Sequence, residues 1–179
     1  MTWQVNYFAS LADHWVYFVD AQTGAVLHKF QHICKDGPAT ATAQDLKGVN
    51  RSLNTYQVGS TYFMLDTQQP MFQVNQSQLP DDPVGGIMTL DLDDNPLNSI
   101  NSLLGHVISG SNNWNSQPTA VSAHYNARVC YEYFSNTHQR NSLNGKGGTI
   151  ISIINIAESD GGGMDNAFWN GHFMGYGSG

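Results

Sequence analysis

Charged side chains are scarce in this sequence of 179 residues: they make up 12% of it, where about 25% is usual for a globular domain. The 7 Lys and Arg residues are outnumbered by 14 Asp and Glu residues, which gives a net charge of -7. Because nucleic-acid affinity depends on clustered basic side chains that neutralise phosphates, this balance excludes nucleic acid as a partner. Asn, Gln, Ser and Thr supply the remaining polarity, and this composition favours an extracellular protein.

Long apolar runs are also lacking. No segment approaches the roughly 18 apolar residues that cross a bilayer, so we expect no membrane partner. The N-terminus does not show the basic and then apolar pattern of a signal peptide. Cysteine is limited to Cys34 and Cys130, which form neither a disulfide framework nor a metal knuckle, so we expect two unpaired thiols.

The first thirty or so residues alternate aromatic and β-branched side chains with polar ones, which predicts a β-meander. Residues 20–24 separate its last two strands and end in Gly24, which can take the positive φ of a hairpin turn. Residues 34–44 are small and lack apolar periodicity, so we interpret them as a linker. We place a domain boundary within this linker, which divides the chain into residues 1–36 and 37–179.

Three short strands are predicted beyond the linker, over residues 61–65, 71–74 and 87–90. Residues 91–117 are polar and rich in Asn and Ser, which indicates a long surface excursion.

A helix is predicted over residues 120–134, with Pro118 at its first position. Its apolar stripe contains Val121, Tyr125, Val129 and Tyr133.

Residues 149–156 are β-branched and apolar on both faces, the pattern of a central strand covered on both sides. The predicted fold is therefore α+β, with a twisted, mostly antiparallel sheet, a hairpin-rich front and one long helix packed against residues 149–156.

No complete catalytic constellation is found in the residues themselves. A His-Glu-x-x-His motif, which would place two zinc ligands and a base on one helix face, is absent. His28 and His32 are the one pair at this spacing; they lack the glutamate, and solvated histidines are the favoured interpretation. Asp91 and Asp93 begin a segment of alternating oxygen donors that a calcium ion could gather, although a plain acidic turn is the favoured interpretation of these residues alone.

Four ordered blocks resemble the thermolysin-like neutral metalloproteases. They are AVSAHYNA leading to YEYF (120–134), NTHQRNS (136–142), DNAFWNG (165–171) and MGYG (174–177). Upstream, residues 50–55 look like the start of the mature peptidase in that family, and residues 18–27 look like the closing hairpin of its propeptide. The resemblance therefore touches nearly the whole chain.

This resemblance implies that residues 1–36 are the end of a propeptide, which assists folding and inhibits the enzyme. Residues 37–179 would be the N-terminal part of the secreted peptidase domain. In the family, the zinc-binding helix follows the MGYG block, so the resemblance implies a fragment that lacks the zinc ligands and is inactive alone. Its implied partners are a peptide or protein substrate, its own propeptide and the missing C-terminal half, where a zinc-activated water would hydrolyse the peptide bond.

The resemblance also assigns roles to residues near the C-terminus. Asn166 would bridge the substrate backbone through its side-chain amide, and Ala167 and Trp169 would offer main-chain groups to an extended peptide. Phe168 would form a wall of the site; the alternative, that Phe168 and Trp169 are ordinary sheet aromatics, is less favoured given the surrounding block. Asp91 and Asp93 resemble a peripheral calcium loop. The alternative function from another class is a non-catalytic peptide-binding or inhibitory module.

Overall fold

The computed structural model describes residues 1–10, 13–31, 36–97 and 104–179. Two compact units make up the chain, Met1–Asp36 and Gly37–Gly179. Within the described residues, no helix combines the length and apolarity that a membrane crossing needs.

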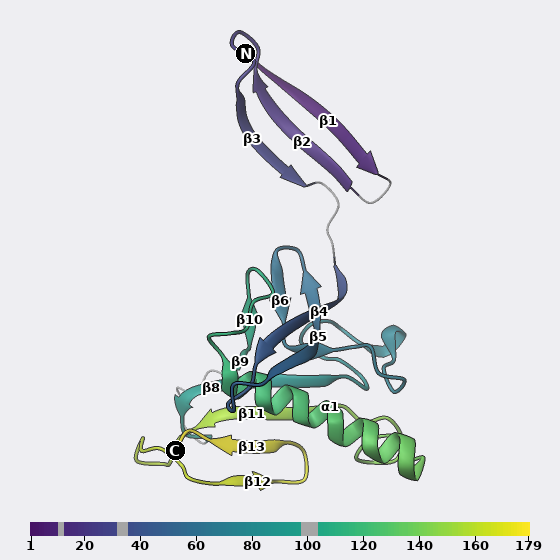
Figure 1. The fold of residues 1–179 in the computed structure, drawn as a ribbon, viewed down its shortest axis with the longest axis vertical. Coiled ribbons are helices and arrows are strands. Elements are labelled where there is room, and N and C mark those ends of the chain that lie inside the picture. Colours follow the sequence, from purple (N-terminus) through teal and green to yellow (C-terminus); the bar gives the residue numbers. More distant parts are fainter. Residues whose placement is uncertain (11–12, 32–35, 98–103) are drawn as a thin grey trace. The chain divides into compact units, whose positions relative to one another are not determined.

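The first unit is an antiparallel three-stranded sheet in the order β1-β2-β3, so the predicted meander is confirmed (Figure 1). Its strands are β1 (Thr2–Ser10), β2 (Asp13–Asp20) and β3 (Val26–Gln31). The predicted hairpin turn is also confirmed: Gly24 has a φ of 72° and its N–H donates to the carbonyl of Asp20. The Asp20 carboxylate accepts from the N–H groups of Gln22 and Thr23, and these bonds lower the pKa of Asp20.

The second unit contains two sheets. The four-stranded sheet has the order β10-β6-β5-β4. Its strands are β4 (Gly37–Gln44), β5 (Asn50–Val58), β6 (Thr61–Phe63) and β10 (Ile108–Ser109). The linker prediction is wrong for residues 37–44, which pair with β5 along their whole length. The reason is that alanine and threonine alternate there, so the small apolar side chains face inward and Ala43 is buried.

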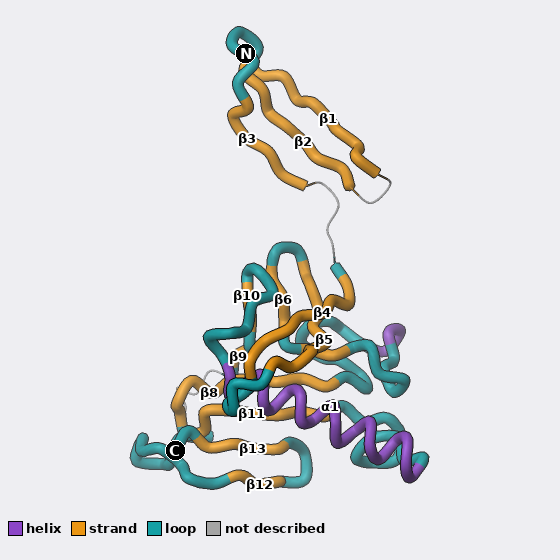
Figure 2. The backbone as a smooth tube through the Cα atoms, in the orientation of Figure 1, coloured by secondary structure: helices purple, strands orange, loops and turns teal. Residues whose placement is uncertain are grey.

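The six-stranded sheet has the path β12-β13-β11-β8-β7, with β9 paired to β8 (Figure 2). Its strands are β7 (Leu65–Asp66), β8 (Ile87–Asn95), β9 (Gly105–His106), β11 (Ile150–Ile156), β12 (Ala167–Trp169) and β13 (Met174–Gly177). The predicted central strand is confirmed, because β11 lies between β8 and β13 and is parallel to both. The other strand pairs are antiparallel.

Helix α1 (Pro118–His138) is the long helix that the sequence predicts, and Pro118 begins it. It packs against β11 and β8 and confirms the α+β fold class. Its buried side matches the predicted stripe only in part, because Val121 is buried whereas Val129 and Tyr133 are exposed. Small side chains predominate near its start, where the helix meets both sheets. The buried helix residues are Ala120, Val121, Ala123, His124 and Tyr131.

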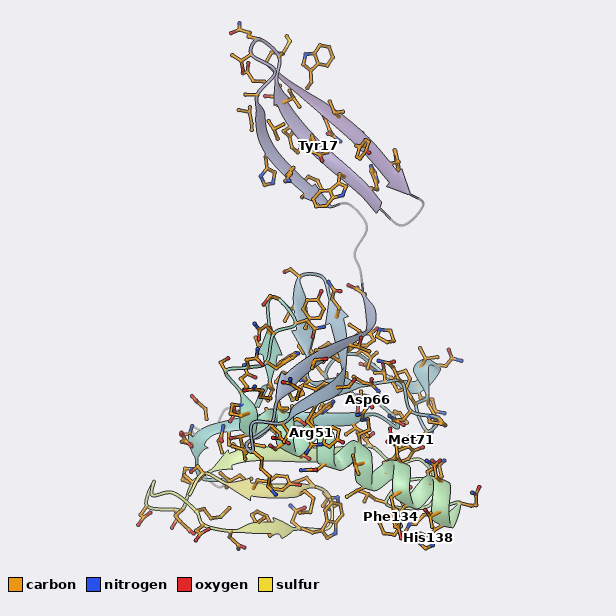
Figure 3. All side chains as sticks on the ribbon, in the orientation of Figure 1. Tyr17, Arg51, Asp66, Met71, Phe134 and His138 are labelled. Atoms are coloured by element: carbon orange, nitrogen blue, oxygen red, sulfur yellow. The ribbon has the colours of Figure 1, made fainter. Side chains whose placement is uncertain are left out.

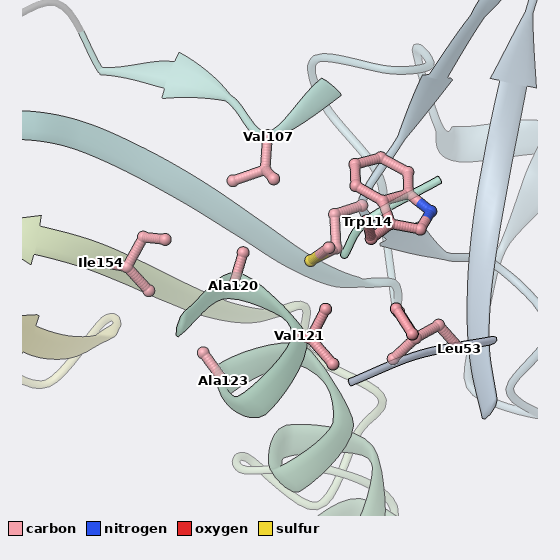
Figure 4. Close-up of a cluster of buried hydrophobic side chains, with 9 residues drawn as sticks. Leu53, Val107, Trp114, Ala120, Val121, Ala123 and Ile154 are labelled. Atoms are coloured by element: carbon pink, nitrogen blue, oxygen red, sulfur yellow. The ribbon is translucent and has the colours of Figure 1, made fainter. Parts of the chain in front are cut away.

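The main core lies where the start of α1 meets both sheets, and Figure 4 shows Trp114, Val121 and Ile154 within it. Trp114 corrects the prediction of a surface excursion over residues 91–117, because its side chain is 0% exposed. Strands β8, β9 and β10 also occupy parts of that segment, and its residues 98–103 lie outside the described part of the chain. The predicted strand over residues 71–74 is wrong: Met71 is buried in a turn that leads into a 3-10 helix, Val74–Gln76 (Figure 3).

Candidate functional site

Strand β12 forms one edge of the six-stranded sheet. It pairs with β13 on one side, and no strand of the described residues pairs with its other side. Two hydrogen bonds flank the paired segment: Gly177 N–H donates to the carbonyl of Asn166 (2.8 Å), and Asn170 N–H donates to the carbonyl of Phe173 (3.3 Å). These bonds fix which backbone groups of β12 turn toward β13.

The backbone of Ala167 and Trp169 faces the open edge. Hydrogen-bonded and non-hydrogen-bonded pairs alternate along an antiparallel ladder. Because Asn166 and Asn170 bond to the β13 side, Phe168 bonds to that side too, and the N–H and C=O groups of Ala167 and Trp169 point away from it. An extended peptide could add to this edge as a further strand.

The side chains of β12 divide between core and solvent. Phe168 is half-buried against the apolar cluster around Ile153 and Ile156, and its ring meets Phe173 edge to face at 6.2 Å. Ala167 and Trp169 are exposed. Phe168 therefore anchors the strand from the inside, and the other two side chains remain free to contact a ligand.

Asn166 precedes β12 and is exposed. Among the described residues, its side-chain amide makes no hydrogen bond, so both its donor and its acceptor face solvent. It lines a hollow of about 460 Å³ together with Ala167 and the first turns of α1, including Ser122 and Asn126. The site thus combines free backbone groups with a free amide beside a partly polar hollow.

A buried polar cluster around His124 connects α1 with strands β8 and β5. The sequence analysis assigned no role to it. His124 of α1 contacts Thr89 of β8 (Nδ1 to Oγ1, 3.0 Å) and the carbonyl of Asn54 in β5 (Nε2 to O, 2.9 Å). Burial lowers the pKa of His124, and the negative charge of Asp66 partly opposes this effect. The spacing of these residues in the sequence carries no signal that could have predicted the cluster.

The predicted calcium residues Asp91 and Asp93 lie beside each other in the structure, and hydrogen bonds hold the Asp91 carboxylate. Asp91 accepts two hydrogen bonds from the amide of Asn155, at 2.9 and 3.0 Å, and one from the N–H of Asp93 at 2.8 Å. Within the described part of the chain, no group of three His, Cys, Asp or Glu side chains could hold a metal ion. His32 lies outside the described residues, so the His28 and His32 pair has no structural description.

Cys130 is exposed and is a free cysteine, whereas Cys34 lies outside the described residues.

An open edge strand with outward backbone groups is a surface to which extended peptides add in many proteins. The model of the thermolysin metallopeptidase catalytic domain matches residues 40–179. The chain belongs to the thermolysin metallopeptidase family.

Individual relatives agree with this assignment. Bacillolysin from Brevibacillus brevis is 32% identical over 176 residues, which cover 98% of this chain and 28% of the relative. Bacillolysin from Bacillus amyloliquefaciens is 33% identical over 178 residues, which cover 98% of this chain and 30% of the relative. A zinc metalloproteinase from Listeria monocytogenes is 32% identical, and the match covers 92% of this chain and 30% of the relative. The chain therefore spans less than a third of the length of these relatives.

Proposed function

We propose that residues 1–36 are the end of a propeptide and that residues 37–179 are the N-terminal part of a secreted zinc metalloendopeptidase. In this proposal β12 binds the backbone of the peptide substrate, Asn166 bridges it through its amide, and Phe168 and Trp169 border it. The observation that carries the proposal is the open edge of β12, where the outward backbone groups of Ala167 and Trp169 have no partner in the described part of the chain.

The proposed zinc ion would bind to a part of the enzyme outside residues 1–179. One relative is named a zinc metalloproteinase. The residues of this chain do not fit a zinc site, because the sequence contains no His-Glu-x-x-His motif and the described residues assemble no metal-binding group. We therefore expect that this chain alone does not hydrolyse peptides. A casein assay with added zinc tests this; hydrolysis that survives repurification and stops with a chelator would contradict it.

Peptide binding by β12 is tested at Ala167, whose N–H points away from β13. Ala167→Pro removes this outward N–H without removing a ladder hydrogen bond, since proline is tolerated at such edge positions. Ala167→Val is the matched control, because it keeps the N–H. We expect Ala167→Pro to weaken binding of an extended peptide about fivefold to tenfold, the effect of one hydrogen bond, while the control binds normally. Equal binding by both variants would contradict the proposed binding mode.

The coding DNA downstream of Gly179 distinguishes the proposal from its alternative. We expect an open reading frame that continues into a His-Glu-x-x-His helix. A stop codon directly after Gly179, together with peptide binding by the chain, would instead support a non-catalytic peptide-binding or inhibitory module.

Calcium binding at Asp91 and Asp93 is a separate part of the proposal. A calcium ion that binds both oxygens of the Asp91 carboxylate would compete with the amide of Asn155, which donates to both of them. Calcium titration followed by thermal unfolding should therefore show tighter binding in Asn155→Gly than in the unmodified chain. Asp91→Asn should show none. Absence of a thermal shift in all three proteins would exclude this site.

A further inference from the structure

The turn between β12 and β13 contains an asparagine followed by a glycine, Asn170 and Gly171. In such a pair the backbone nitrogen of the glycine can reach the side-chain carbonyl of the asparagine, because glycine has no Cβ to obstruct the approach. The sequence contains one other pair of this kind, Asn144 and Gly145, and all four residues are exposed. The two pairs allow a comparison within one molecule.

The side-chain carbonyl of Asn170 is held by two backbone N–H groups that would stabilise the negative charge formed when its carbon is attacked. Its Oδ1 accepts hydrogen bonds from the N–H groups of His172 (2.9 Å) and Phe173 (3.0 Å). Attack by the nitrogen of Gly171 on Cγ would move negative charge onto Oδ1, where these two donors already point, as in an oxyanion hole. Gly171 has a φ of 99°, and among the described residues its N–H has no hydrogen-bond partner.

Asn144 also has two N–H donors on its Oδ1, but the N–H of the glycine that follows it is hydrogen-bonded. Its Oδ1 also accepts two backbone N–H groups, from Lys146 (2.8 Å) and Gly148 (3.0 Å). The N–H of Gly145, however, donates to the carbonyl of Ser142 (3.3 Å). The attacking nitrogen must lose its proton, so this hydrogen bond has to break before attack. The Asn144 amide also lies close to Gly148, where an added Cβ would come within 2.8 Å of its Nδ2.

We propose that Asn170 is a site of spontaneous deamidation and that Asn144 is its protected counterpart. The nitrogen of Gly171 loses its proton to a solvent base and bonds to Cγ of Asn170. The Cγ–Nδ2 bond then breaks, and Nδ2 takes a proton from water and leaves as ammonia. Water opens the resulting succinimide at either carbonyl, which gives aspartate or isoaspartate at position 170. The reaction needs no oxidant or reductant and adds one negative charge.

The isoaspartate product places an extra methylene in the backbone directly after Trp169. It lengthens the turn between residue 170 and Phe173, which the hydrogen bond from Asn170 N–H to the Phe173 carbonyl now closes, and so disturbs the end of the pairing between β12 and β13. Modification would therefore alter the open edge over time. This consequence for peptide binding rests on the proposed function, whereas the deamidation itself does not.

Peptide mapping by mass spectrometry tests the proposal on the full chain. The chain is incubated at mildly alkaline pH in ¹⁸O-labelled water and then digested, and incorporation of one labelled oxygen is measured at each asparagine. We expect deamidation at Asn170 to be about fivefold faster than at Asn144, a difference of about 1 kcal/mol in activation free energy. Asn170→Gln should remove the signal at position 170.

Digestion before incubation provides the matched control, since both pairs should then react at similar rates in unfolded peptides. Equal rates in the folded chain, a faster reaction at Asn144, or no reaction at Asn170 while its peptide reacts would each overturn the proposal. The measurement detects mass alone, so it stands or fails independently of peptide binding by β12.

Discussion

The Nδ1 atom of His124 lies 3.0 Å from the hydroxyl oxygen of Thr89, and the histidine is only 1% exposed. Nε2 of the same ring lies 2.9 Å from the carbonyl oxygen of Asn54. A carbonyl only accepts hydrogen bonds, so Nε2 carries the proton and Nδ1 accepts from Thr89. A neutral His124 thereby joins α1, β8 and β5 through two satisfied hydrogen bonds.

Stability should consequently fall in acid. Burial lowers the pKa of His124; the charge of Asp66 and the bond to Asn54 act in the opposite direction, and the charge of Arg128 adds to the lowering. Below the unfolded pKa of 6.5, the unfolded chain binds a proton that the folded chain does not. The free energy of unfolding should then decrease by up to about 1.4 kcal/mol per pH unit, until the pH reaches the lowered pKa of the folded state.

Urea unfolding of the unmodified chain and of His124→Gln between neutral and mildly acidic pH measures this effect. The variant lacks the titrating group, so its stability should change less over the same range, whatever its stability at neutral pH. Parallel pH profiles for the two proteins would show that His124 does not cause the acid sensitivity.

The two tryptophans Trp114 and Trp169 should respond differently to the same substitution. Trp114 is 0% exposed and donates from Nε1 to Asn112 Oδ1 at 2.9 Å, whereas Trp169 is 47% exposed. Trp114→Ala leaves a large cavity and should lower the free energy of unfolding by about 3–5 kcal/mol. Trp169→Ala should change it by less than about 0.5 kcal/mol. Chemical denaturation checks both, and a similar loss for both variants would contradict the packing described here.

Elements with strong periodic patterns could be predicted from the sequence. The hairpin ending at Gly24, the helix beginning at Pro118 and the central strand β11 each have a local signal in turn chemistry or apolar spacing. Strand β4 was missed because its inward residues are alanines, which add little to an apolar pattern. Trp114 was assigned to the surface because the residues around it are polar, and its burial depends on distant parts of the chain.

The isoleucines of β11 agree with the sequence pattern of a central strand covered on both faces. Ile153 and Ile154 are 4% and 2% exposed, because they pack into two different clusters on opposite sides of the sheet. The described unit covers both faces of β11 by itself.

The candidate site was only partly accessible from sequence. The family resemblance of the block around Asn166 predicted where the site lies in the sequence. The outward direction of the Ala167 and Trp169 backbone groups could be determined only from the register between β12 and β13. The buried cluster around His124 and Asp66 could not be predicted, because its members come from separate elements that only the fold brings together.

Asp66 should be essential to that cluster. Its carboxylate is fully buried and accepts from Gln69 Nε2 (2.7 Å), Gln68 N–H (2.8 Å) and Asn54 Nδ2 (3.0 Å). Asp66→Ala leaves three donors without this acceptor and should lower the free energy of unfolding by about 2–4 kcal/mol. Asp165→Ala, which removes an exposed carboxylate, is the matched control and should cost little. If thermal denaturation shows equal effects, the carboxylate of Asp66 does not stabilise the unit as inferred.

The close approach of Gly175 to Phe168 links the core to the open edge strand. A Cβ atom on Gly175 would lie 2.6 Å from Cζ of Phe168 and 2.9 Å from Cδ1 of Ile156, so Gly175→Ala overpacks this contact. We expect a loss of about 1–3 kcal/mol in the free energy of unfolding. Gly110→Ala is the matched control, since a Cβ there meets no atom within 4 Å.

A smaller side chain at position 168 should relieve this clash. Phe168→Leu in the Gly175→Ala background should recover part of the lost stability, even though Phe168→Leu alone is destabilising, because the two substitutions act on one contact. A double-mutant cycle measured by chemical denaturation gives the coupling free energy directly. Strictly additive effects would show that Gly175 is required for a reason other than the position of Phe168, and the ring would then not be the element that holds β12 in place.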